Sequence, residues 1–144
     1  MSENNQYFEE LCKFIEEAKI TQNFSRVASA AKPISASEDA ILCELTVAQE
    51  HVNGKRTMHG GQSASLIDIF TQWAVKITNL NATLSSVDIS CSYMNPTPFG
   101  ETIYINAKVL KKGRTMAFTE CEIRRKSDNR LLVKGQQTLS ILNN

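Results

Sequence analysis

Residues 59–68 hold the side chains and backbone groups in this sequence that could do chemistry: a His-Gly-Gly turn, then one carboxylate, Asp68, in an apolar run. The first N–H groups of a helix lack partners and carry partial positive charge, so Gly60 and Gly61 could let a carbonyl approach and be polarised. An aspartate among apolar neighbours is rarely buried without a partner, and here no partner is evident nearby in the sequence. Asp68 could therefore orient or deprotonate water, or attack a carbonyl directly. The structural alternatives are a plain glycine turn and an aspartate that faces solvent or a neighbouring strand.

The spacing of these groups predicts how they would cooperate. Asp68 follows Gly60 by eight residues, which is about 12 Å along a helix that rises ~1.5 Å per residue. A carboxylate there cannot reach a carbonyl held at the start of its own helix. If both groups serve one reaction, the site is shared between two subunits, and a two-fold dimer forms two such sites.

The elements that would position these groups follow from hydrophobic periodicity. Residues 1–22 include an amphipathic helix, and residues 59–78 form a central helix without a wide polar face. Residues 84–142 contain four alternating strands separated by turns, which predicts an antiparallel meander. We therefore expect an α+β protein in which one domain, residues 1–144, wraps an antiparallel sheet around a long central helix. This is the hotdog fold.

Composition narrows the class of protein. The net charge of +1 argues against binding to nucleic acid, and no apolar run is long enough to span a bilayer. Four widely spaced cysteines without a CxxC motif indicate reduced thiols, so we expect an intracellular and cytoplasmic protein. Mitochondrial localisation stays open, although the acidic N-terminus is unlike a transit peptide. His51 and His59 lack metal-ligand spacing, so we expect neither a metal nor a cofactor.

The segments "HVNGKRTMHGGQSASLID", "SSVDISCSYMNP", "GETIYINAKVLKKGRTMAFTECEI" and "LLVKGQQT" resemble the PaaI-like hotdog acyl-CoA thioesterases, in particular the animal branch called thioesterase superfamily member 2. The resemblance covers residues 45–142. It implies that Asn53 and Ser86 help to place the attacking water. It also implies that His59 and Gly60 form the turn that polarises the thioester carbonyl, and that Asp68 of the opposing subunit is the nucleophile or general base.

The resemblance also implies where coenzyme A and the acyl chain would lie. The CoA phosphates would contact a basic hairpin that contains Lys111, Gly113 and Arg114. A basic loop before the His-Gly-Gly turn, with Lys55 and Arg56, and the second glycine of that turn, Gly61, would also contact the substrate. An apolar tunnel at the interface would take the acyl chain, with Phe70, Trp73 and Ile77 as candidates. Ordinary packing in the core is the alternative for these three side chains.

We therefore expect an enzyme that hydrolyses medium- to long-chain fatty acyl-CoA, with acyl-CoA as its small-molecule partner and CoA present only as part of substrate and product. A homodimer is required for the site, and the family usually forms tetramers. Two alternatives stay open. One is a dimeric acyl-CoA-binding protein without activity, and the other is a hotdog hydratase or dehydratase, which would need a His paired with an acid.

Overall fold

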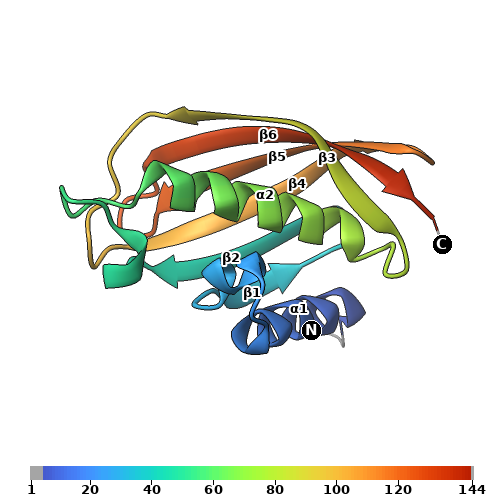
Figure 1. Ribbon diagram of the computed structural model, residues 1–144, viewed down its shortest axis with the longest axis horizontal. Coiled ribbons are helices and arrows are strands. Elements are labelled where there is room, and N and C mark those ends of the chain that lie inside the picture. Colours follow the sequence, from blue (N-terminus) through green and yellow to red (C-terminus); the bar gives the residue numbers. More distant parts are fainter. Residues whose placement is uncertain (1–4, 144) are drawn as a thin grey trace.

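One curved antiparallel sheet half encloses a long helix, and this confirms the expected hotdog fold (Figure 1). The computed structural model describes residues 5–143. The strands are β1 (Lys32–Ala36), β2 (Ala40–Thr46), β3 (Thr83–Tyr93), β4 (Thr102–Lys112), β5 (Met116–Arg125) and β6 (Leu131–Leu142). The helices are α1 (Gln6–Ile20), α2 (Gly60–Lys76) and the short 3-10 turns η1 (Phe24–Ala28) and η2 (Gln49–His51).

The strand order β1-β2-β4-β5-β6-β3 corrects one expectation. A simple meander would place β3 beside β4, but β3 pairs with β6 at the far edge of the sheet. Only β4, β5 and β6 follow one another as a meander. The connection after β3, residues 94–101, crosses from one edge strand to the interior of the sheet, whereas a hairpin would join two neighbours.

The central helix is held close to the sheet by a glycine on β6. A Cβ added at Gly135 would lie 2.8 Å from the Cγ2 of Ile67 on α2 and 3.1 Å from the backbone oxygen of Ser90 on β3. No side chain fits there, so α2 approaches the backbone of β6. The close approach fixes the middle of α2, where Asp68 lies, against the inner face of β6 and β3.

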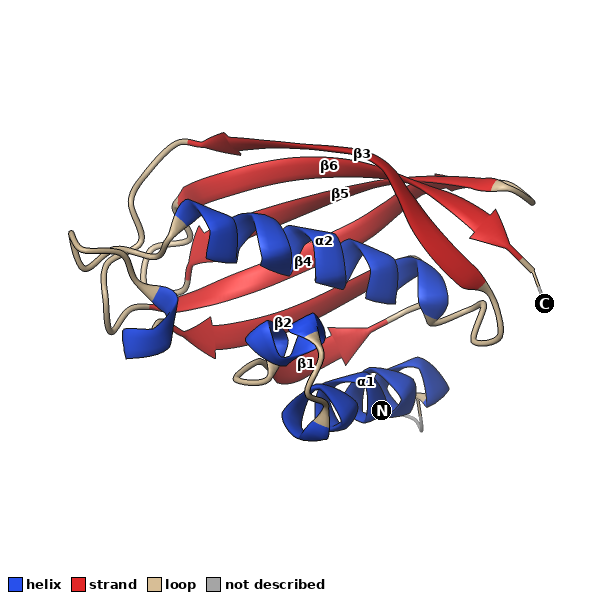
Figure 2. Ribbon diagram, viewed as in Figure 1, coloured by secondary structure: helices blue, strands red, loops and turns tan. Residues whose placement is uncertain are grey.

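The N-terminal helix lies at the other edge of the sheet, beside β1 (Figure 2). The Asn5 Oδ1 caps α1 by accepting from the N–H groups of Tyr7 and Phe8. Leu11 and Ile15 of this helix are buried in the core. Residues 1–4 of the expected N-terminal segment lie outside the described residues. The β3 edge is therefore left uncovered by α1.

Candidate active site

The first turn of α2 presents one free backbone donor. His59 is the N-cap residue, and its Nδ1 accepts from the Gly61 N–H at 2.8 Å. The His59 carbonyl accepts from the N–H groups of Gln62 and Ser63, at 2.9 and 3.1 Å. The Gly60 N–H has no acceptor among residues 5–143. A negatively charged oxygen placed there would meet both a free N–H and the positive end of the helix.

The two glycines of the turn therefore differ in what they can do. The Gly61 N–H is already bonded to His59, so it does not provide a second oxyanion donor. A Cβ at Gly61 would lie 2.9 Å from the His59 Nδ1, which explains why this position is glycine. The His59 ring is a cap that orients the turn, because its Nδ1 accepts a backbone N–H.

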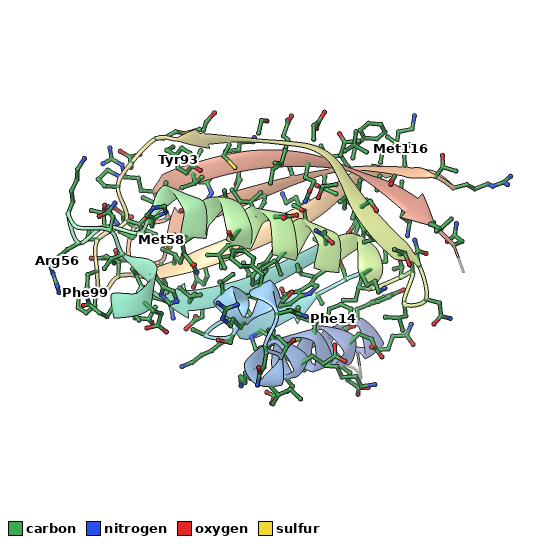
Figure 3. All side chains as sticks on the ribbon, in the orientation of Figure 1. Phe14, Arg56, Met58, Tyr93, Phe99 and Met116 are labelled. Atoms are coloured by element: carbon green, nitrogen blue, oxygen red, sulfur yellow. The ribbon has the colours of Figure 1, made fainter. Side chains whose placement is uncertain are left out.

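Tyr93, at the end of β3, holds the Gly60 peptide from the other side. Its hydroxyl donates to the Gly60 carbonyl oxygen at 3.0 Å. The ring lies 3.6 Å from where a Cβ of Gly60 would be. Tyr93, Gly60 and Met58 line a cleft of about 280 Å³. Figure 3 shows Met58 and Tyr93 near the same end of α2. Strand periodicity alone gave no indication that Tyr93 belongs to the site.

A buried histidine, His51, holds the His-Gly-Gly turn through its backbone carbonyl. The His59 N–H donates to the His51 carbonyl at 2.8 Å, and the His51 Nδ1 accepts from the Ala48 N–H at 2.9 Å. Burial lowers the pKa of His51, against a smaller and opposite effect of Glu50. His51 is 4 % exposed, so it serves as a neutral structural residue.

The second group lies at the middle of α2, where the structure corrects the expectation that Asp68 lacks a nearby partner. Asp68 is half-buried, and its Oδ1 accepts from the Gln72 Nε2 at 2.7 Å. Gln72 lies one turn later on the same helix. The Ser86 hydroxyl of β3 lies 3.4 Å from the same Oδ1. The structure thus brings Asp68 and Ser86 together within one subunit.

A buried glutamine, which was not among the residues predicted from the sequence, completes this cluster. Gln137 of β6 is 1 % exposed. Its Oε1 accepts from the Ser86 hydroxyl at 2.6 Å. Its Nε2 donates to the Asp68 carbonyl at 3.1 Å and to the Thr71 Oγ1 at 2.7 Å. Asp68 and Ser86 are therefore held by side chains from α2 and β6.

Asn53 shapes the loop that leads to the helix. Its Oδ1 accepts from the Lys55 N–H at 2.9 Å, the Thr57 N–H at 3.2 Å and the Thr57 hydroxyl at 3.3 Å. The turn is tight enough that Arg56 takes a positive φ of 62°. With the oxygen occupied, the Nδ2 group of Asn53 is the part that can donate to a ligand.

The basic residues expected at the phosphates form two groups that are far apart in one subunit. Arg56 lies at one end of the long axis, with its guanidinium 4.3 Å from the centre of the Phe99 ring. The hairpin that holds Lys111, Gly113 and Arg114 ends at Met116, at the opposite end (Figure 3). Lys55, Lys111 and Arg114 are exposed. The nucleotide part of one CoA molecule can contact both groups of basic residues only where two subunits lie side by side.

Two of the three apolar candidates for an acyl tunnel belong to the core. Phe70 is fully buried and Ile77 is 3 % exposed, so neither offers surface to a ligand. Trp73 is half-buried and stacks on Phe14 of α1, with ring centroids 5.8 Å apart. The two rings lie between two clefts, and one of these also includes Gln72.

Residues 5–143 contain neither a cluster of metal-ligating side chains nor a helix suited to crossing a membrane. No group of three or more His, Cys, Asp or Glu side chains within residues 5–143 could hold a metal ion. In the same part of the chain, no helix has both the length and the apolar character that crossing a membrane requires.

The chain is similar in sequence and in fold to known thioesterases. Residues 56–132 match the thioesterase superfamily. Human acyl-coenzyme A thioesterase 13 is 36 % identical over 138 residues, which are 96 % of this chain and 96 % of that protein. The crystal structure of zebrafish thioesterase superfamily member 2 superposes with a TM-score of 0.88 at 32 % identity, over 92 % of this chain and 96 % of that chain. Escherichia coli PaaI shares the fold, with a TM-score of 0.74 at 20 % identity, over 93 % of this chain and 97 % of that chain.

Proposed function

Because the chain belongs to the thioesterase superfamily and is a thioester hydrolase, we propose that it hydrolyses fatty acyl-CoA to the free acid and CoA. The similarity to human acyl-coenzyme A thioesterase 13 supports acyl-CoA as the substrate class. The reaction needs water and the thioester alone. We propose no metal or cofactor for it.

One observation carries the proposal: α2 presents a free backbone donor, the Gly60 N–H, at its start and a carboxylate, Asp68, at its middle, where the Ser86 hydroxyl of β3 lies beside it. The two lie eight residues apart, or about 12 Å along the helix. A single subunit therefore holds half of each of two sites. The complete site forms when Gly60 of one subunit meets Asp68 of the other.

The β3 edge supports this pairing. β3 is an edge strand of 11 residues, longer than most edge strands that avoid association. Val87 is 54 % exposed and Ile89 is 41 % exposed on it. Ile89 pairs with the buried Gln137, so its side chain points to the inner face beside α2. We propose that a second subunit covers this edge and this part of the inner face in a two-fold dimer, which could pair again into a tetramer.

In the proposed reaction, Asp68 takes a proton from water, and the water oxygen bonds to the carbonyl carbon of the thioester. The carbonyl electrons move to the oxygen, where Gly60 of the partner subunit donates its N–H to the developing charge. Collapse of this intermediate breaks the C–S bond. The CoA thiolate leaves, and the proton held by Asp68 passes to it. Asn53 and Ser86 would hold the water during the attack.

The remaining substrate contacts follow from the same dimer. The hairpin of one subunit, with Lys111, Gly113 and Arg114, would lie near Lys55 and Arg56 of the partner subunit and meet the CoA phosphates. The cleft beside Trp73 and Phe14 begins one helical turn from Asp68 and would receive the acyl chain. Because this cleft is open to solvent at the surface, we propose that medium to long chains fit.

The test is a thiol-release assay on acyl-CoAs of increasing chain length. Wild-type protein should release CoA, and Asp68→Ala should lower kcat on the order of 10²–10³-fold. Asp39→Ala, which removes an exposed carboxylate between β1 and β2 at the opposite edge of the sheet from β3, is the matched control and should keep wild-type activity. Near-normal hydrolysis by Asp68→Ala would contradict the mechanism, and tight acyl-CoA binding without turnover by the wild type would contradict the function.

A further inference from the structure

We infer that Gln72 and Gln137 are positioning residues that fix the hydrogen-bond polarity of the Asp68–Ser86 pair, so that both side chains accept from one water molecule. This inference rests on the proposed function and adds to it the direction of each hydrogen bond at the water. Neither glutamine is expected to touch the reacting thioester, although Gln72 lines the cleft proposed for the acyl chain. Both act through Asp68 and Ser86.

The orientation of the Gln137 amide follows from its neighbours. The Thr71 hydroxyl donates its single proton to the Ile67 carbonyl at 2.7 Å, so the Thr71 oxygen accepts. The Asp68 carbonyl can only accept. The group of Gln137 that faces both oxygens must therefore be the NH₂ group, at 2.7 and 3.1 Å. The Oε1 then faces Ser86, because the amide is buried and cannot turn over without losing these bonds.

The Gln137 amide in turn fixes the proton of Ser86. A serine hydroxyl has one proton to donate and two lone pairs that accept. The Oγ lies 2.6 Å from the Gln137 Oε1 and 3.4 Å from the Asp68 Oδ1. The shorter bond takes the proton. Ser86 is therefore left with lone pairs on the side that faces Asp68, and these accept from a water.

Gln72 determines which oxygen of the Asp68 carboxylate is free to accept a proton from water. Its Nε2 donates to the Asp68 Oδ1 at 2.7 Å, and Ser86 lies nearest to the same oxygen. Both protein neighbours lie on the Oδ1 side, which leaves the Oδ2 for the proton of water. A water between Asp68 and Ser86 would donate one proton to the carboxylate and the other to the serine, and its lone pair would point to the carbonyl carbon.

The two glutamines should shift the pH dependence of kcat in opposite directions when each is replaced by Met, which has a similar size. Gln72→Met removes a hydrogen-bond donor from the ionised Asp68 carboxylate, so the acidic limb of the profile of kcat against pH should move to higher pH. Gln137→Met frees the Ser86 proton to donate to Asp68, so the acidic limb should move to lower pH. Each shift should be about 0.5–1 pH unit. Gln137→Met should also lower the plateau kcat about tenfold with KM within about twofold, because Ser86 no longer accepts from water.

The other charged groups around the pair are kept constant in these variants. Lys76 of α2 and Glu17 of α1 line the same cleft as Gln72, and Asp88 lies on the outward face of β3 opposite Thr138. Gln136, the exposed neighbour of Gln137, is the matched control. Gln136→Met should leave kcat, KM and the pH profile unchanged.

Two further measurements separate positioning from loss of structure. In a Ser86→Ala background, Gln137→Met should no longer move the acidic limb, because there is no hydroxyl proton to redirect. If Gln137→Met does not fold, as judged by circular dichroism, the positioning role is tested by Gln72→Met alone, in which the acidic limb should move to higher pH. Gln72 is only half-buried and should tolerate the change.

The inference is overturned if Gln72→Met leaves the acidic limb in place, or if both variants move it in the same direction. These outcomes can be told apart from failure of the proposed function itself. If Asp68→Ala is inactive and the glutamine variants show no opposite shifts, only the positioning role fails. If Asp68→Ala keeps its activity, the proposed function fails first.

Discussion

At the start of α2 the polar groups of the proposed site are backbone atoms held by the His59 cap, whereas eight residues later they are side chains held by two glutamines. The first arrangement depends on glycine, since Gly61 leaves room for the His59 ring and the Gly60 N–H stays free. The second depends on partners from β3 and β6. Substitutions in the two parts of the site should therefore reduce activity for different physical reasons.

The largest effect is expected at the Gly60 N–H. Proline at this position removes the N–H, but it suits the first residue of a helix, and His59 already has the extended ψ of 136° that a residue before proline needs. Gly60→Pro should lower kcat on the order of 10²–10³-fold in the thiol-release assay. KM for acyl-CoA should change little.

Gly60→Ala is the control for this change, because alanine keeps the N–H. Its methyl group would lie 3.6 Å from the Tyr93 ring, an ordinary contact. Activity close to wild type is expected. If alanine were as damaging as proline, the loss would come from the side chain, and the N–H would not be the oxyanion donor.

A smaller effect is expected from the hydroxyl of Tyr93. Tyr93→Phe removes the hydrogen bond to the Gly60 carbonyl, so the peptide that carries the free N–H loses one restraint. We expect kcat to fall roughly 2- to 10-fold, the usual range for one hydrogen bond. Steady-state kinetics with Tyr104→Phe as a control on β4 checks this expectation. A wild-type kcat would mean that the cap alone holds the peptide.

The smallest effect concerns stability and the buried His51. Its pKa in the folded protein is lowered from the ordinary value of 6.5 by burial, so the unfolded chain binds a proton more readily than the folded one. The free energy of unfolding should be highest above pH 6.5 and should fall as the pH drops below it. The slope should not exceed about 1.4 kcal/mol per pH unit.

Denaturant unfolding between pH 7.5 and 5 measures this dependence. A variant without an ionisable group, His51→Gln, should lose part of it. His59→Asn should keep it, because asparagine is also a good N-cap residue and His51 is unchanged. An equal pH dependence in wild type and His51→Gln would assign the effect to other groups.

Much of the fold could be predicted from periodicity. The apolar run after Gly60 and the alternating strands give the helix, the sheet and the way that one wraps the other. The position of β3 in the sheet could not be predicted in this way, because strand periodicity indicates which residues face inward but not which strand lies beside β3. The pairing of β3 with β6 depends on the crossover of residues 94–101, a tertiary feature.

The candidate site was predictable where one residue type at one spacing carries the chemistry, as for Gly60 and Asp68. The partners of Asp68 were not selected, although both left a signal. Gln72 follows Asp68 by four residues, the spacing of neighbours on a helix face. Gln137 occupies an inward position of β6 between Gly135 and Leu139, where an apolar residue is the rule. A polar side chain at such a position indicates a buried partner.

The shared site is the central claim, and subunit mixing tests it most directly. Asp68→Ala and Gly60→Pro subunits, each nearly inactive alone, are unfolded and refolded together in equal amounts. In a mixed dimer, Gly60 of the first chain meets Asp68 of the second, so one of the two sites is intact. Random pairing makes half of the dimers mixed, which predicts recovery of about a quarter of the wild-type activity. A mixture no more active than its two parents would contradict a site built from two subunits.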